Sequence, residues 1–144
     1  LVSPLLEQAL ESGAGLRKLK EMIAAQGGNP AVCDDVNLLP QAPVVIEATS
    51  RQAGYVASMD AHGVGLVSMH LGGGREAKED DIDLAVGVVL HKKVGDCVAL
   101  GESLGTIHAR TAEAAAEAAE LLRGCYTLSE EKTERAAFIK GVVR

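Results

Sequence analysis

The sequence predicts an α+β fold. Three observations indicate it: short helical segments open the chain, runs of β-branched residues follow them, and an alanine-rich helix comes after the last long run. Within the β-rich part, glycine turns at Gly95-Asp96 and at Gly101 are spaced to fold short strands into a tight sandwich. With 144 residues, the chain is long enough for one sizeable core.

Residues 1–43 are predicted to be helical at first and then extended. A first helix runs from Pro4 to Glu11, and a second carries its apolar residues on one stripe and ends at Gly27-Gly28. From residue 29 to residue 43 the composition shifts to Asn, Asp, Gln and three prolines, which disfavour helix in the residues before them. We expect this stretch to be a linker, with residues 44–144 as the main domain.

The first half of the main domain is predicted to contain three strands and a helix. Val44–Ser50 and Ala53–Met59 are rich in β-branched residues and predict two strands. Asp60 is a candidate N-cap for a short helix, which the glycines at 72–74 would end. The apolar run Ile82–Leu90 predicts the third strand.

The second half of the main domain is predicted to pack around the glycine turns. The helix Thr111–Arg123 consists of good helix formers and is followed by Gly124. Cys125–Leu128 predicts a last short strand, and the residues beyond Ser129 are expected to be weakly structured. The side chains expected to point inward at the turns are Val94, Val98, Leu104 and Ile107.

Composition excludes several classes of partner. The formal charge of −6 disfavours nucleic acid, whose binding needs clustered Lys and Arg. Aromatic residues are 2% of the chain, which excludes a base-stacking platform. No segment approaches the roughly 18 consecutive apolar residues of a membrane span. We therefore expect a soluble cytoplasmic protein without a nucleic-acid or membrane partner.

No metal or cofactor site is predicted. The cysteines Cys33, Cys97 and Cys125 are widely spaced and odd in number, so we expect free thiols. The acidic cluster at residues 79–83 lacks the alternating ligands and central glycine of a calcium loop and predicts a solvated face. The histidines do not show metal-ligand spacing; they are His62, His70, His91 and His108.

The glycine segment LGGGREAKEDD, residues 71–81, is a candidate functional loop. Consecutive glycines allow backbone N–H groups to approach an anion. The segment contains neither the phosphate-loop pattern nor the dinucleotide-binding pattern. Two interpretations stay open: a flexible exit from a helix into a charged loop, or a loop that contacts substrate or a neighbouring domain.

A swinging-arm carrier is a competing interpretation of the turn region. The pattern G-D-x-V-x-x-G-x-x-L-x-x-I, residues 95–107, resembles one half of a biotinyl or lipoyl carrier domain. Such a carrier needs a modifiable lysine soon after this half, whereas the segment that follows Ile107 is a helix without lysine. The nearby lysines, Lys92 and Lys93, come before the turn. This favours the same geometry used purely as structure.

Several strings together resemble the pyrimidine-nucleoside and thymidine phosphorylases. Each string is weak alone, and their order and spacing carry the resemblance, which covers residues 5 to about 128. The strings are LKEMIAAQGGNPAV (19–32), LPQA (39–42), GYV (54–56), LGGGREAKEDDIDLAVGVVLHKKVGD (71–96) and GESLGTIHA (101–109).

The resemblance implies a domain organisation. By this resemblance, the parent enzyme would be a homodimer. Each subunit would have a small helical domain and a larger α/β domain, and the larger domain would end in a C-terminal portion. Residues 1–43 would be the helical end of the parent α/β domain plus a linker, and residues 44–144 the C-terminal domain. The fold implied for the latter is an α/β-hammerhead with a barrel-sandwich-hybrid-like β unit.

The resemblance also implies a reaction. Phosphate attacks the anomeric carbon of a pyrimidine nucleoside and releases the base and a pentose 1-phosphate, without a cofactor. The family's phosphate-binding segment, of the Lys-x-Ser-Thr-Gly-Gly type, is missing from these residues, as are its pyrimidine-binding residues. The chain is therefore expected to be a C-terminal fragment without catalytic residues, which depends on the rest of the parent enzyme for phosphate and nucleoside. The alternative is a free-standing, non-catalytic binding or carrier-like module.

One segment carries over from the family as a candidate site. The residues Gly72, Gly73, Gly74 and Arg75 are similar to a mobile segment that borders the cleft between domains, and we expect them to act as a closure loop. The usual Gly-Ala-Gly-Arg is Gly-Gly-Gly-Arg here, which predicts a looser loop.

Overall fold

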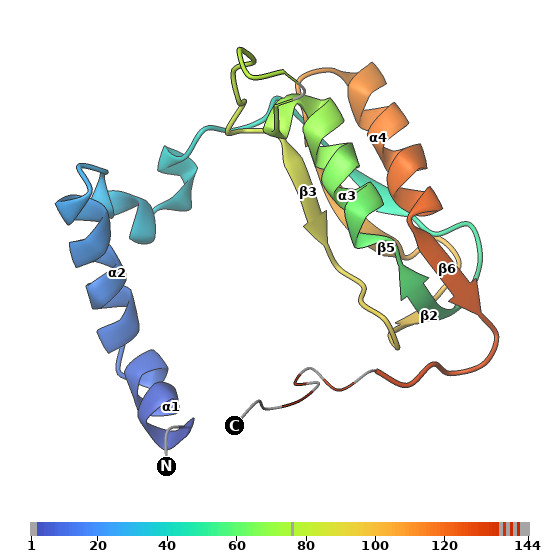
Figure 1. Ribbon diagram of the computed structural model, residues 1–144, viewed down its shortest axis with the longest axis horizontal. Coiled ribbons are helices and arrows are strands. Elements are labelled where there is room, and N and C mark those ends of the chain that lie inside the picture. Colours follow the sequence, from blue (N-terminus) through green and yellow to red (C-terminus); the bar gives the residue numbers. More distant parts are fainter. Residues whose placement is uncertain (1–2, 76, 136, 138, 140, 142–144) are drawn as a thin grey trace. The chain divides into compact units, whose positions relative to one another are not determined.

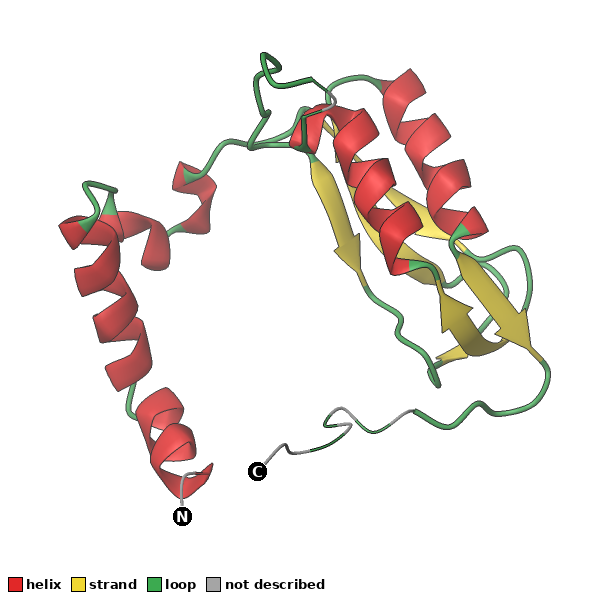
Figure 2. Ribbon diagram, viewed as in Figure 1, coloured by secondary structure: helices red, strands yellow, loops and turns green. Residues whose placement is uncertain are grey.

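A computed structural model describes residues 3–75, 77–135, 137, 139 and 141. The chain divides into two compact units, residues 1–41 and residues 42–144. Helices and small antiparallel sheets are both present, which confirms the predicted α+β class (Figure 2). Of the part of the chain that is described, no helix has the length and apolarity needed to cross a membrane.

The first unit consists of short helices (Figure 1). The predicted pair is confirmed as α1, Ser3–Glu11, and α2, Ala14–Ala25. They meet at Gly13, whose φ of 69° lies in the left-handed region that glycine favours. Two turns of 3-10 helix follow, η1 (Pro30–Cys33) and η2 (Val36–Leu38), in the stretch predicted to be an extended linker. Asn29 and Asp35 cap them, because short polar side chains compete well for free backbone N–H groups.

The second unit contains two three-stranded antiparallel sheets. The first has the order β1 (Val44–Thr49), β5 (Ser103–Ala109), β3 (Gly87–Leu90). The second has the order β4 (Cys97–Val98), β2 (Gly54–Met59), β6 (Tyr126–Ser129). The strands predicted at 44–50, 53–59 and 125–128 are thus confirmed within one residue at each end.

Two helices pack side by side on the first sheet (Figures 1 and 2). They are α3, Ala61–Ser68, and α4, Ala112–Gly124. The Thr111 hydroxyl accepts a hydrogen bond from the Ala114 N–H at 3.1 Å, which fixes the start of α4 as a capping residue does. The buried face of α4 consists mainly of alanine, which lets the helix lie close to β1 and β5. Its residues are Ala115, Ala118, Ala119 and Leu122.

The core forms where the glycine turns bring strands together. Gly95 and Gly101 have φ angles of 89° and 80°, so both turns use a backbone conformation that other residues adopt only with strain. Val98, Leu104 and Ile107 are almost completely buried, and Val94 packs against them. The prediction that these four side chains point inward is confirmed.

The predicted strand Ile82–Leu90 is wrong over its first half. Only Gly87–Leu90 forms β3, because the carboxylate of Asp83 accepts a hydrogen bond from the Ala85 N–H at 3.0 Å and bends the chain before the sheet. Of the residues after Ser129 that are described, none belongs to a helix or strand.

Candidate functional site

The glycine segment begins where the helix after Asp60 ends. Past α3 the chain continues as a π-helical turn, η3 (Met69–Gly73), so the helix and its glycine end are confirmed. Gly72 leaves the helical conformation with a φ of 98°, and this left-handed residue turns the chain away.

Each of the next two glycines is closely surrounded. A Cβ at Gly73 would lie 3.0 Å from both the carbonyl oxygen and the hydroxyl of Ser68. A Cβ at Gly74 would lie 3.1 Å from Cγ of Met69. Glycine is thus favoured at Gly72 by its positive φ, and at Gly73 and Gly74 by close neighbouring atoms.

Asp83 and Arg110 hold the far end of the segment. The Asp83 N–H donates to the Gly72 carbonyl oxygen at 2.9 Å, which closes the segment into a loop. Two N–H groups of Arg110 donate to the Asp83 carboxylate. The hydrogen bonds from Arg110 are the largest cause that lowers the pKa of Asp83, and the bond from the Ala85 N–H is the next. Together they lower this pKa to about 2. The expectation that the whole acidic cluster is a solvated face is wrong for Asp83, because Arg110 partly covers it.

Arg75 stands at the start of the loop with an exposed side chain. Its guanidinium makes no hydrogen bond or ion pair with another described residue. Farther along, the Asp80 carboxylate accepts from the Ala77 N–H at 2.8 Å, which forms a turn. Glu76, between them, lies outside the described residues. The loop thus combines a fixed base with a cation in water.

A polar cluster on the first sheet was not predicted from the sequence. Neighbouring strands β1 and β5 place Glu47 beside Ser103 and Thr106, and both hydroxyls donate to its carboxylate. These bonds, that of Ser103 first, lower the pKa of Glu47. His91 Nε2 lies 2.7 Å from the Thr106 hydroxyl and 3.8 Å from Glu47. Because the same ring nitrogen faces both groups, this is not the relay in which a carboxylate orients the second nitrogen of a catalytic histidine.

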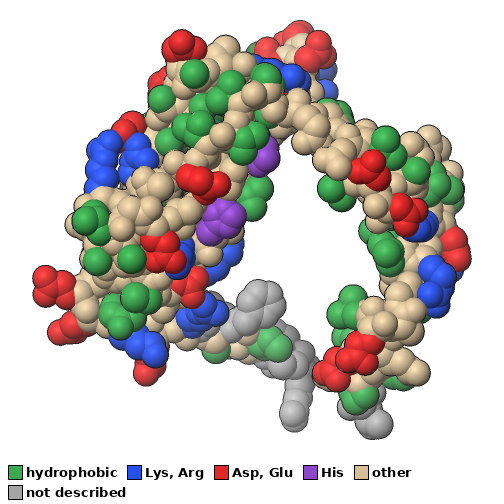
Figure 3. All heavy atoms as spheres, turned by 180° about the vertical axis from the view of Figure 1, so that it is seen from behind, with side chains coloured by type: hydrophobic (Ala, Val, Ile, Leu, Met, Phe, Trp, Pro, Cys, Tyr) green, Lys and Arg blue, Asp and Glu red, His purple; other side chains and the backbone are tan. Residues whose placement is uncertain are grey.

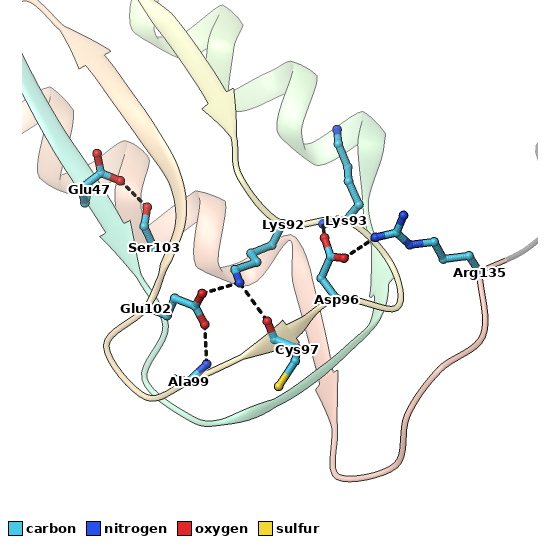
Figure 4. A network of polar contacts seen from close by, with 9 residues as sticks. All are labelled: Glu47, Lys92, Lys93, Asp96, Cys97, Ala99, Glu102, Ser103 and Arg135. Atoms are coloured by element: carbon cyan, nitrogen blue, oxygen red, sulfur yellow. Dashed lines mark hydrogen bonds and ion pairs between the residues drawn. The ribbon is translucent and has the colours of Figure 1, made fainter.

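The turn region carries a second network (Figure 4). Lys92 forms an ion pair with Glu102 and donates to the Cys97 carbonyl oxygen at 2.9 Å. Glu102 also accepts from the Ala99 N–H at 2.7 Å, so it ties both sides of the Gly101 turn. Of the two lysines near the turn, Lys92 has 17% of its side chain exposed, whereas Lys93 is exposed.

The remaining candidate ligands stay apart. Across the described residues, no group of three or more His, Cys, Asp or Glu side chains could hold a metal ion. Cys33, Cys97 and Cys125 are free thiols, and burial raises the pKa of Cys125. On the face shown in Figure 3, acidic and basic side chains are interspersed.

Comparison with known proteins gives one family. The model of the pyrimidine nucleoside phosphorylase C-terminal domain matches residues 55–129, which include β2 except its first residue, β3 to β6, and both helices on the sheet. The pyrimidine-nucleoside phosphorylase of Staphylococcus aureus (strain bovine RF122 / ET3-1) is 53% identical over 104 residues, and that of Geobacillus stearothermophilus is 51% identical over 104 residues.

Both alignments cover 72% of this chain and 24% of the relative. The chain thus spans about a quarter of the length of these curated relatives. The glycine segment, the Gly95 and Gly101 turns and the alanine-rich helix all lie inside the range matched by the family model. This protein therefore belongs to the pyrimidine nucleoside phosphorylase C-terminal domain family.

Proposed function

We propose that the chain acts as the C-terminal domain of a pyrimidine-nucleoside phosphorylase, in which phosphate and a pyrimidine nucleoside give the free base and a pentose 1-phosphate. The observation that carries this proposal is the match over residues 55–129, together with 51% to 53% identity to enzymes of that name. Phosphate, nucleoside and the rest of the enzyme are then its partners, in a cytoplasmic homodimer that functions in nucleoside salvage.

The proposal divides the chain between two domains of that enzyme. Residues 1–43 would be the helical end of the α/β domain with its linker, and residues 44–144 the C-terminal domain. Two observations support this division: the proline-rich composition before Val44 and the separate packing of residues 1–41.

The fold proposed for the C-terminal domain is an α/β-hammerhead with a barrel-sandwich-hybrid-like β unit. In support, successive strands alternate between the two sheets, with β1, β3 and β5 in the first and β2, β4 and β6 in the second. The two sheets share one core, which includes Val56, Val98, Leu104 and Ile107.

The catalytic residues of the reaction would lie in the remainder of the enzyme. Phosphorolysis needs cationic groups and backbone donors that converge on the nucleophile and on the charge that develops at the base. The Lys-x-Ser-Thr-Gly-Gly segment that would supply the phosphate site does not occur in these 144 residues. We therefore expect the isolated chain to be inactive.

The glycine segment would contribute as a closure loop. A closing loop needs a fixed base and a tip that gains contacts only on closure. Here Asp83 and Arg110 fix the base, and Arg75 is exposed without a described partner. Its guanidinium is thus available to an anionic or polar group that another domain presents.

A phosphorolysis assay of the purified 144-residue chain tests the expected inactivity. Thymidine and uridine are each incubated with phosphate, with the Geobacillus stearothermophilus relative as the positive control. We expect no release of base above the buffer background. Phosphate-dependent release by the isolated chain would overturn the assignment of the catalytic residues to the rest of the enzyme.

A further inference from the structure

Two arginines from different elements converge on one carboxylate, away from the glycine segment. Arg51 lies in the connection between β1 and β2, and Arg123 lies in the last turn of α4. Both donate to the same oxygen, Oε1 of Glu120. The hydrogen bond from Arg123 and the charges of both arginines lower the pKa of Glu120, so this carboxylate is ionised at neutral pH.

This cluster has more cations and donors than its own carboxylate uses. Two guanidinium groups and one carboxylate leave one positive charge. Each guanidinium has five N–H donors. Both guanidinium groups bond to Glu120. Arg123 also donates to the Thr49 carbonyl oxygen at 3.4 Å. The Arg123 side chain is only 19% exposed, and its buried Nε atom has no hydrogen-bond partner within the described structure.

A cavity of about 340 Å³ opens beside the cluster. Its wall includes the charged side chains named above. It also includes Leu104 and Tyr126, which are buried, and Leu128, which is half-buried. The Tyr126 hydroxyl lies 3.0 Å from the Lys92 carbonyl oxygen and 3.3 Å from that of Leu104, so this group is already satisfied by the backbone. What remains to a ligand here is the apolar surface.

We propose that this cavity binds a compact organic carboxylate, whose charged group joins or displaces Glu120 between Arg51 and Arg123 and whose apolar body lies against Leu128. The structure already holds one carboxylate in this position, which is the geometry that two guanidinium groups recognise. The volume lies at the lower end of the range for small-molecule sites, about 300–1,000 Å³, so the ligand is small.

The proposal is tested by titrating the 144-residue chain with benzoate and, separately, with acetate. Binding is measured from the shifts of the backbone amide NMR signals of residues 50–52 and 123–128. Benzoate is expected to bind more tightly than acetate, because only benzoate has an apolar body for the cavity wall. Arg51→Ala should weaken benzoate binding about tenfold, the size expected for a lost charge-assisted hydrogen bond. Arg51 has 71% of its side chain exposed, so its removal should leave the core intact.

Glu120→Gln gives the sharper result. It removes the charge of the resident carboxylate and should tighten benzoate binding about tenfold. The matched control is Glu117→Gln, which makes the same charge change one turn earlier on α4, outside the cavity lining. The control should change affinity by clearly less than Glu120→Gln does, because Glu117 forms no ion pair with Arg51 or Arg123 in the described structure.

Three results would each overturn the proposal. One is Glu120→Gln binding benzoate no more tightly than the unaltered chain. Another is an equal gain from Glu117→Gln, which would show an effect of net charge alone. The third is equal binding of acetate and benzoate, which would exclude a role for the apolar wall. Melting temperatures of all the variants establish that each comparison is between folded chains.

Discussion

Asp83 organises the candidate loop through three kinds of contact. Its N–H holds the Gly72 carbonyl oxygen, its carboxylate accepts from the Ala85 N–H, and the same carboxylate pairs with Arg110. The first closes the loop, the second bends the chain before β3, and the third joins the loop to the residue that follows β5. Asp83, which the sequence places in an acidic cluster at the surface, thus sets the geometry of the glycine segment.

The Asp83–Arg110 pair should make stability depend on pH in acid. The pKa of Asp83 falls from 3.8 to about 2 on folding, so the folded state favours the ionised form. Its contribution is complete above pH 3.8 and is lost as the pH falls towards 2. We expect the melting temperatures of the unaltered chain and Asp83→Asn to differ above about pH 4 and to converge between about pH 4 and pH 2.

Asp81→Asn is the control for this measurement, since Asp81 is exposed and two residues away. It removes the same charge without removing the Arg110 contact. A pH-independent difference between Asp83→Asn and the unaltered chain would contradict the assigned role of the ion pair.

Gly105 marks the closest approach between β5 and its neighbours. A Cβ there would lie 2.7 Å from the Val89 carbonyl oxygen and 3.1 Å from a Cδ atom of Leu122. Gly105→Ala should therefore lower the free energy of unfolding by about 1–3 kcal/mol, as overpacked core positions do. Gly65→Ala, inside α3 with nothing within 4 Å of its Cβ position, should be neutral or stabilising. Urea unfolding of both variants measures the difference, and equal effects would contradict the packing described for β5.

At the scale of elements, the glycine segment is a helix end that becomes a loop. The π-helical turn η3 continues α3 up to Gly73, and the chain then returns to β3 after Asp83. The close contacts of Gly73 with Ser68 make substitutions there a test of packing as well as of loop motion. Arg75 is a cleaner position, because its side chain is exposed.

Arg75→Ala is expected to lower turnover in a full-length phosphorylase that contains this chain. The loss should be about tenfold, if the guanidinium makes one charge-assisted contact on closure. Lys78→Ala removes an exposed cation from the same loop and serves as the control. Steady-state kinetics with uridine and phosphate measure both variants. Unchanged turnover in Arg75→Ala would show that the segment is only a helix terminus.

Much of the element pattern could be predicted from local sequence. The helix over residues 112–124 has strong formers and a capping threonine, and the glycine turns at 95 and 101 require left-handed backbone conformations. These signals lie within a few residues of the structure they determine. The boundary errors at β3 arose because the Asp83 turn interrupts an apolar run that otherwise has the composition of a strand.

Strand pairing could not be predicted in the same way. β1 pairs with β5 across more than fifty residues, and β2 lies between β4 and β6 in the other sheet. Such contacts depend on the complete core. For the same reason, no local pattern indicates the Glu47–Ser103–Thr106 cluster or the Arg51–Glu120–Arg123 cluster, whose members meet only after folding.

At the scale of the whole molecule, the family strings from residue 54 onward occupy positions that build one core. The glycine segment ends a helix, the Gly95 and Gly101 turns connect strands of the two sheets, and the string that ends at Ala109 forms β5 between its two neighbours. Residues that carry the resemblance are therefore mainly structural in this chain. In the enzyme proposed above, this domain would contribute its shape and its loop, and the catalytic residues would lie in the remainder of the enzyme.

The central claim is that this chain can serve as the C-terminal domain of a pyrimidine-nucleoside phosphorylase. The direct measurement is phosphate-dependent release of uracil from uridine by a chimera of the Geobacillus stearothermophilus enzyme. In the chimera, the segment aligned with this chain is replaced by the matching residues of this chain.

The negative control is the Geobacillus stearothermophilus enzyme from which the segment aligned with this chain has been removed. We predict that the chimera releases uracil at a rate within about tenfold of the unaltered enzyme, a difference of about 1.4 kcal/mol in the activation free energy. A chimera that melts as cooperatively as the unaltered enzyme but releases no base above the negative control would contradict the account.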